Sequence, residues 1–110
     1  MKDFELTVLF RPDIDDLESA LDRLRYIIVN HGGEIIKEEN DGKKRLAYPI
    51  MEYDYAIYYF FVLKLPTDER SEICRILNIT DEVLRYLLVR RDSRENSTAL
   101  ANKKLQTQTS

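Results

Sequence analysis

The sequence predicts an α+β fold with one domain, and three observations support this prediction: the chain length, the spacing of the apolar residues and the order of the elements. A chain of 110 residues is too short to divide its apolar side chains between two cores, so we expect one core. Four segments have the character of extended strands, and two show the three- and four-residue apolar spacing of a helix. The elements follow one another as β-α-β-β-α-β.

The first predicted strand spans residues 4–10 and is followed by a helix. One face of the strand is apolar at period two and consists of Phe4, Leu6, Val8 and Phe10. Arg11-Pro12-Asp13 then breaks the strand and supplies Asp13 as a candidate helix N-cap. The apolar stripe of the helix consists of Ile14, Leu17, Leu21, Leu24 and Ile28. His31-Gly32-Gly33 ends the helix, because glycine adopts the left-handed conformation that closes a helix C-terminus.

A second strand is predicted from Glu34 to about Ile50, and a third over residues 56–63. Pro49 cannot donate a hydrogen bond to a neighbouring strand, so we expect the end of the second strand at an edge of the sheet. A short turn near residues 52–54 joins the two strands. Residues 56–63 are apolar without polar alternation, which predicts a strand that is covered on both faces or docks one face on a partner.

The last two predicted elements are a short helix and a strand. Pro66-Thr67-Asp68-Glu69 is typical of a helix start, with Thr67 as the cap and two acids near the positive end of the helix dipole. The apolar residues of the helix are Ile73, Ile76 and Leu77. A final strand follows over residues 83–91, with Leu84, Tyr86 and Leu88 predicted on one side.

The element order leads to a particular architecture. Because two helices have to cover one sheet face and β-α-β crossovers are right-handed, we expect the ferredoxin-like sandwich, a four-stranded antiparallel sheet with two helices on one face. The first and third strands are then central, the second and fourth are edges, and the other face stays open to water or to a ligand. We assign this domain to residues 1–92. Residues 93–110 have few apolar side chains and a formal charge of +2, so a flexible, polar, mildly basic tail is expected.

Composition excludes several classes of protein. The single cysteine cannot form an internal disulfide, which favours a reducing compartment. The longest apolar run, residues 55–63, is far shorter than the roughly 20 residues that span a bilayer. Early carboxylates such as Asp3 fit neither a signal nor a transit peptide, so a cytoplasmic protein is expected. The net charge of −3 argues against non-specific nucleic-acid binding driven by whole-molecule charge.

The sequence gives little sign of catalysis. His31 lies in the turn that ends the first helix, and Cys74 lies near apolar neighbours on the short helix, where a small buried hydrophobe is the simpler interpretation. Carboxylate pairs fall at helix starts, in turns or on an exposed strand, which is typical of solvated surface. Neither phosphate-binding glycine motif is present. We therefore expect no catalytic residue, no metal site and no cofactor.

A group of cations close to aromatic residues is the remaining candidate site. Lys43, Lys44 and Arg45 place three positive charges on the second strand, shortly before Tyr48. Strand alternation puts Lys43 and Arg45 on one face and Lys44 on the other. Further cations close the last strand and follow it: Arg90, Arg91 and Arg94. Two interpretations stay open, namely edge-strand charges that prevent aggregation of sheets and an edge that binds phosphates.

The segment Gly42–Ile50, GKKRLAYPI, resembles the signature of the ribosomal protein six family of the bacterial small subunit. The opening strand, the turn at residues 30–35 and the closing strand at 81–90 are similar to the same family, and the resemblance extends over residues 1–92. It implies a ferredoxin-like fold and a structural role in the small subunit, with neither enzyme activity nor a cofactor. It also implies binding to the central domain of 16S ribosomal RNA together with ribosomal protein eighteen, and hence a cytoplasmic location on the ribosome.

The resemblance also implies which residues face the RNA and which face the partner protein. The RNA side implied by the resemblance consists of Lys43, Lys44, Arg45 and Tyr48, and the charge pattern adds Arg90, Arg91 and Arg94 as weaker candidates. The partner interface is expected at Tyr58, Phe60, Tyr86 and Leu88. The turn Met51–Tyr55 departs from the family, because it has lost the cations that members often carry there.

A second hypothesis from another functional class accounts for the apolar third strand. A ferredoxin-like regulatory or oligomerisation domain would bind a small molecule or its own copy through the open sheet face. Ribosomal protein eighteen would supply the same cover, so the sequence leaves both hypotheses open.

Overall fold

The fold is that of a computed structural model, which describes residues 1–91. The predicted tail, and residue 92 at the end of the predicted domain, lie outside the described residues. The elements are β1 (Lys2–Phe10), α1 (Leu17–Asn30), β2 (Glu34–Ile50), β3 (Tyr53–Leu65), a 3-10 turn η1 (Thr67–Glu69), α2 (Arg70–Asn78) and β4 (Val83–Arg90). The β-α-β-β-α-β order predicted from apolar spacing is confirmed.

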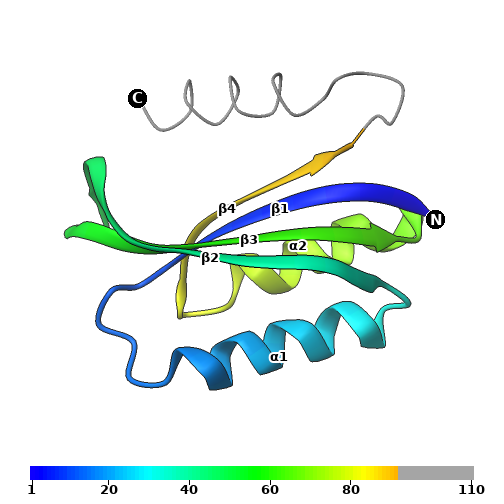
Figure 1. Ribbon diagram of the computed structural model, residues 1–110, viewed down its shortest axis with the longest axis horizontal. Helices are drawn as coiled ribbons and strands as arrows, with labels where there is room; N and C mark the ends of the chain where they lie inside the picture. Colours follow the sequence, from blue (N-terminus) through cyan, green and yellow to red (C-terminus); the bar gives the residue numbers. More distant parts are fainter. Residues whose placement is uncertain (92–110) are drawn as a thin grey trace.

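The four strands form one antiparallel sheet in the order β2-β3-β1-β4. β1 and β3 are therefore central and β2 and β4 are the edges, as predicted. Both helices lie on the same side of the sheet, and its other side carries no helix among the described residues (Figure 1). None of the helices is long and apolar enough to cross a membrane within the described part of the chain.

The main core lies between the sheet and the two helices. The predicted apolar face of β1 enters it, with Leu6 and Val8 fully buried. The apolar stripe of α1 packs against this face, and α2 contributes Ile73 and Leu77. From β3 the core receives the side chains that alternate along one face of the strand: Ile57, Tyr59, Phe61, Leu63 and Leu65.

A second, smaller cluster lies on the opposite face of the sheet. Leu9, Leu46 and Ala56 are buried in it, and Tyr58 packs against them. This cluster accounts for the first part of the apolar run of β3, because Ala56 and Tyr58 enter it while the alternate side chains of the strand enter the main core. The second face of β3 is thus covered only in part, because Val62 is buried whereas Tyr58 and Phe60 stay partly exposed.

Two predicted helix caps are wrong. Asp13 does not cap α1, since its carboxylate binds the side chains of Arg11 and Tyr53. Asp16 is the N-cap and accepts hydrogen bonds from the backbone N–H of Ser19 at 3.1 Å and from its hydroxyl at 2.8 Å. Thr67 opens the 3-10 turn and makes no side-chain capping bond, so α2 begins at Arg70.

The predicted face of Leu84 is also wrong. The pairing of β1 with β4 shifts between Leu9 and Phe10, which face Arg85 and Val83. Leu84 is therefore an extra residue in a β-bulge, and it packs in the second cluster. Tyr86 and Leu88 stay on the helix side, so the three side chains predicted on one face are divided between the two.

Candidate functional site

The paired ends of β2 and β3 bend away from the helices and form one end of the molecule (Figure 1). Regular pairing runs as far as Arg45, which lies opposite Tyr55, and the next pair joins Ile50 to Tyr53. Residues 46–49 of β2 therefore oppose a single residue of β3, and this wide bulge makes the strand bend. The bend carries the end of β2 over the open face of the sheet.

A two-residue loop, Met51 and Glu52, connects the strands. Both residues have positive φ, 51° and 72°, as the tight hairpin turns that match strand twist require. The start of β3 is held from the other side, where the Arg11 guanidinium lies 5.7 Å from the ring centroid of Tyr53. The Tyr53 hydroxyl donates to Asp13 at 3.0 Å. These contacts join the hairpin end to the loop between β1 and α1.

Lys43, Lys44 and Arg45 are all exposed on this hairpin. The Lys43 Nζ lies 5.5 Å from the ring centroid of Tyr55, and the Lys44 Nζ lies 5.4 Å from that of Tyr58. Lys43 lies opposite Ile57, whose side chain packs against the main core. Lys44 lies opposite Ala56, which is buried in the second cluster on the other face. The two lysines therefore point to opposite faces, as strand alternation predicted.

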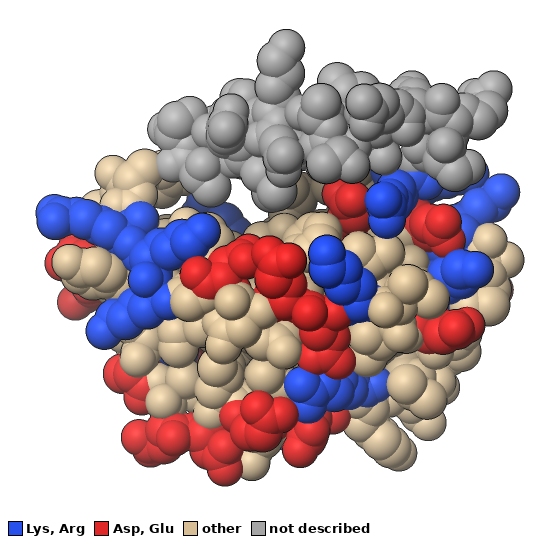
Figure 2. Space-filling view, viewed as in Figure 1, with Lys and Arg blue, Asp and Glu red and all other residues tan. Residues whose placement is uncertain are grey.

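These three cations differ from most others on the surface. Within residues 1–91, no carboxylate lies within ion-pair distance of Lys43, Lys44 or Arg45. Six other cations each have at least one such partner: Arg11, Arg23, Arg25, Lys37, Arg75 and Arg91. Figure 2 shows Lys and Arg gathered over the hairpin end, while acidic residues predominate along the side formed by α1. The hairpin thus has positive charge that no carboxylate of residues 1–91 neutralises.

Two acids moderate this charge on the open face. Partial burial raises the pKa of the Asp41 carboxyl, and a hydrogen bond with Glu39 raises it further. Lys44 and Lys37 act in the opposite direction on the same carboxyl. The open face beside Lys44 therefore has mixed charge, whereas Lys43 and Arg45 lie on the other face of the strand.

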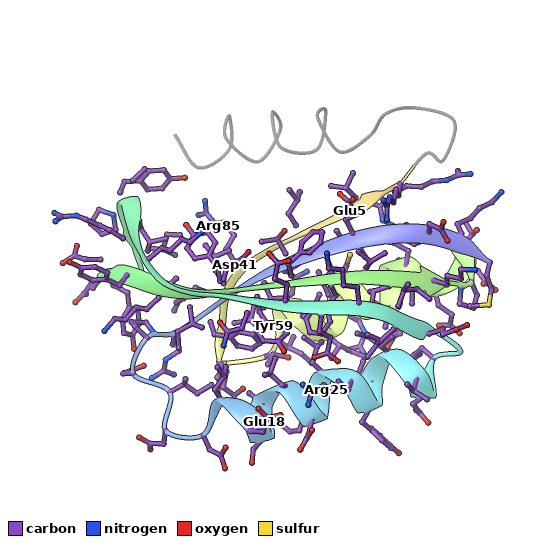
Figure 3. The ribbon with its side chains drawn as sticks, in the orientation of Figure 1. Glu5, Glu18, Arg25, Asp41, Tyr59 and Arg85 are labelled. Atoms are coloured by element: carbon purple, nitrogen blue, oxygen red, sulfur yellow. The ribbon has the colours of Figure 1, made fainter. Side chains whose placement is uncertain are left out.

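Tyr48 is exposed in the bulge of β2, and Arg85 of β4 reaches it. The Arg85 Nη1 donates to the Tyr48 hydroxyl at 2.9 Å, and the guanidinium carbon lies 5.9 Å from the ring centroid. Arg85 projects from the side of the sheet opposite α1 (Figure 3). The sequence analysis did not include Arg85 in this site. Arg85 lies between Leu84 and Tyr86, which were predicted on one face of the strand, so alternation would have placed it on the other face. The two edge strands thus meet at this end of the sheet.

The remaining predicted cations do not join the cluster. Arg90 is exposed and lies opposite Phe4, near the start of β1. Lys43 lies opposite Ile57, which pairs with Phe10 at the end of β1. Arg91 lies 3.6 Å from the Glu5 carboxylate. Arg94 lies outside the described residues. The structure therefore brings together Lys43, Lys44, Arg45 and Tyr48 and separates them from the end of β4.

The four residues predicted to meet a partner protein are divided by the sheet. Tyr58 and Phe60 lie on the open face and are partly exposed, and burial raises the pKa of the Tyr58 hydroxyl. Leu88 is 4% exposed in the main core. Tyr86 packs against the same core, and its hydroxyl donates to the backbone carbonyl of Cys74 at 3.3 Å. Tyr86 and Leu88 thus face the helices.

His31 and Cys74 occupy structural positions. His31 is the C-cap of α1, and its Nδ1 lies 3.2 Å from the Glu69 carboxylate. Cys74 is partly buried against the main core. No group of three or more potential metal-ligating side chains occurs in residues 1–91.

The fold and the cluster together define a class of protein: a small ferredoxin-like α+β domain with a basic, tyrosine-lined hairpin at one end of its sheet. The sequence model of the ribosomal protein S6 family matches residues 3–90. The chain therefore belongs to the ribosomal protein S6 family, and the resemblance found in the sequence is confirmed.

Curated relatives agree with this assignment. The chain is 35% identical over 94 residues to small ribosomal subunit protein bS6 of Caldanaerobacter subterraneus, covering 84% of this chain and 99% of the relative. The bS6 proteins of Syntrophomonas wolfei and Heliobacterium modesticaldum are 34% and 31% identical, over 86% and 84% of this chain and 100% and 98% of their own lengths. The crystal structure of 30S ribosomal protein S6 from Thermotoga maritima has the same fold, with a TM-score of 0.78, 22% identity and 97% coverage of both chains.

Membership of the family establishes the coarse function. The protein is a structural component of the small ribosomal subunit, located on the ribosome in the cytoplasm, and it is not an enzyme.

Proposed function

We propose that the protein binds the central domain of 16S ribosomal RNA, together with ribosomal protein eighteen, and that the hairpin end of β2 contacts the RNA. The observation that carries this proposal is the group of three adjacent cations without a carboxylate partner in residues 1–91, beside the exposed Tyr48. A cation in an internal ion pair has to give up that partner to bind a phosphate. Lys43, Lys44 and Arg45 have no such cost.

The expected energetics follow from counterion release. Each neutralised phosphate contributes roughly 0.7 to 0.9 to the slope of the logarithm of affinity against the logarithm of salt concentration. Three contacts from Lys43, Lys44 and Arg45 therefore contribute about two to three to that slope. Arg90, Arg91 and Arg94 are weaker candidates, since Arg91 already has Glu5 as a partner.

The open face of the sheet is the proposed contact with ribosomal protein eighteen. Tyr58 and Phe60 contribute aromatic side chains to it, and Leu87 and Val89 of β4 lie on the same face. A partly exposed apolar face of this kind fits a protein partner better than a phosphate backbone. Tyr86 and Leu88 are left out of this surface because their side chains face the helices.

A charge-neutralising variant tests the RNA contact. The triple variant Lys43→Gln, Lys44→Gln, Arg45→Gln is compared with the wild type in filter-binding titrations at several salt concentrations, each with ribosomal protein eighteen present. We expect weaker binding to the 16S RNA fragment and a salt slope lower by about two to three. The matched control, Lys2→Gln, Arg23→Gln, Arg75→Gln, removes the same charge from other surfaces and is expected to keep most of the slope.

Two results would contradict the proposal. Unchanged affinity and slope in the hairpin variant would show that these cations do not meet phosphates. A wild-type protein that sediments only as a free homo-oligomer, without RNA or ribosomal protein eighteen, would favour the oligomerisation hypothesis instead.

A further inference from the structure

The pairing of Tyr48 with Arg85 has geometry that phosphate binding alone does not explain. Tyr48 lies in the part of β2 that has no regular partner on β3, so strand pairing does not fix the position of its ring. Arg85 fixes it from β4 in two ways, through a hydrogen bond to the hydroxyl and a guanidinium near the ring. The contact spans the two edge strands of the sheet and helps to orient the ring.

The contact leaves much of the tyrosine free. Tyr48 is 48% exposed although Arg85 lies against it. A half-exposed aromatic ring with a cation beside it offers a surface on which a second flat group can stack. The neighbouring cations Lys43 to Arg45, which have no carboxylate partner in residues 1–91, precede it on the same strand and favour a ligand that carries phosphates. A nucleotide has both chemistries, a flat base and a phosphate.

The base that stacks on such a platform has to be unpaired. In a continuous RNA duplex both faces of each base are covered by its neighbours, and the bases are recessed in narrow or shallow grooves. Bases in loops and bulges expose a face to aromatic side chains, and loss of one such stack costs about 1 to 3 kcal/mol, which is about 5- to 150-fold in affinity.

We infer that Tyr48 stacks on an unpaired nucleobase of the RNA and that Arg85 is a positioning residue that holds the tyrosine ring for that stack. This inference rests on the proposed function, because it names the part of the RNA that the hairpin recognises. Lys43, Lys44 and Arg45 then bind the phosphates that flank the unpaired base.

A double-mutant cycle tests the two roles. Tyr48→Leu, Arg85→Gln and the double variant are titrated with the central-domain fragment of 16S RNA, with ribosomal protein eighteen present. We expect about 5- to 150-fold weaker binding for Tyr48→Leu with an unchanged salt slope, because stacking releases no counterions. Arg85→Gln is expected to weaken binding only when Tyr48 is present. Tyr26→Leu is the matched control, since Tyr26 is 69% exposed on α1.

A second probe tests the class of ligand. The wild-type complex is expected to prefer a short RNA duplex that contains one bulged nucleotide over the same duplex fully paired, and Tyr48→Leu is expected to lose that preference. Tyr48→Phe keeps the ring but loses the hydrogen bond from Arg85, so it is expected to retain most of the preference. This variant also controls for a folding defect in Tyr48→Leu.

The outcomes separate this inference from the proposed function. Binding that is lost in the Lys43, Lys44, Arg45 variant but unchanged in Tyr48→Leu would overturn the stacking inference and leave the proposed function intact. A salt slope that falls by about one in Arg85→Gln, additively with Tyr48→Leu, would make Arg85 a phosphate contact and overturn its positioning role. A wild-type complex that binds no RNA would overturn both proposals.

Discussion

At the scale of single residues, Arg25 joins two layers of the molecule. Its guanidinium donates to the Glu38 carboxylate from Nε at 2.9 Å and from Nη2 at 2.8 Å. The same carboxylate accepts from the Tyr59 hydroxyl at 2.9 Å, and Arg25 also reaches Glu18 and Asp22. Figure 3 shows Arg25 and Glu18 on α1 and Tyr59 on the side of the sheet that faces this helix. The network therefore attaches α1 to β2 and β3.

Glu38→Gln is expected to destabilise the fold in a pH-dependent way. Hydrogen bonding with Arg25 holds the pKa of the Glu38 carboxyl below its usual value. Its stabilising contribution is therefore fully present above the usual pKa of a glutamate, and it is lost as the pH falls through the lower folded-state pKa. At pH 7 we expect a loss of about 1 to 3 kcal/mol in urea unfolding. That loss should shrink at pH 3.

Glu34→Gln is the control for this measurement. Glu34 is exposed on the same strand and has no ion pair within residues 1–91. Its substitution should change the unfolding free energy by less than about 0.5 kcal/mol. An equal effect of the two substitutions would contradict the role given to Glu38.

Gly33→Ala and Gly42→Ala are expected to differ in cost. A Cβ on Gly33 would lie 2.6 Å from a methyl carbon of Leu65 and 2.8 Å from the backbone oxygen of Ile28, so the packing of α1 against β3 would have to shift. A Cβ on Gly42 meets nothing within 4 Å, and only its φ of +85° is unfavourable. We expect Gly42→Ala to cost about 1 to 2 kcal/mol and Gly33→Ala more, as measured by thermal unfolding. The reverse order would show that the close approach is relieved cheaply.

At the scale of elements, α1 begins three residues later than the sequence predicted, and the cap can be tested directly. Asp16→Ala removes the two hydrogen bonds that Ser19 donates and is expected to lower the midpoint of urea unfolding. Asp15→Ala changes the neighbouring exposed carboxylate and should cost much less. Equal losses would mean that general charge near the helix start, rather than the cap, stabilises α1.

The errors of prediction have a common physical origin. The spacing of apolar residues and the positions of Gly and Pro identified the four strands and the two α-helices in order, because apolar spacing records which face of each element is buried. The cap was misplaced because Asp13 and Asp16 are equally suitable residues, and only the contact of Asp13 with Tyr53, far along the chain, decides between them. The bulge at Leu84 has no local signature at all, since it depends on the register of β4 against β1.

The candidate site was predictable in part for the same reason. Lys43, Lys44 and Arg45 are adjacent in sequence, so their cluster needs only a strand. Arg85 joins Tyr48 because two bulges and a bent hairpin bring the edge strands together, and such non-local geometry leaves no trace in residue spacing. Tyr86 and Leu88 were expected at a partner surface, but the register of β4 against β1 turns their side chains toward the helices, and that register is likewise a non-local property.

At the scale of the whole molecule, the charge is divided. Residues 93–110 carry a formal charge of +2, which leaves −5 for residues 1–92. An acidic body repels RNA at long range, and the local cations of the hairpin oppose this repulsion. Binding of RNA is therefore expected to depend on a partner that supplies further contacts.

We expect the protein alone to bind the 16S RNA fragment weakly, and the pair with ribosomal protein eighteen to bind it more tightly. Filter-binding titrations of the lone protein and of the pair, at one salt concentration, measure the difference. Equally tight binding by the lone protein would show that the hairpin suffices and that the acidic body has little effect.

The position of β1 in the sheet has a consequence for synthesis. β1 is made first, yet its two neighbours are β3 and β4, and it pairs with β4 as far as Arg90. While the chain is being translated, both edges of β1 become paired only after nearly the whole described domain has left the ribosome. During that interval its backbone edges and apolar side chains are available to wrong partners. Nascent chains that stop before β4 should therefore aggregate or recruit chaperones, and chains that extend past it should not.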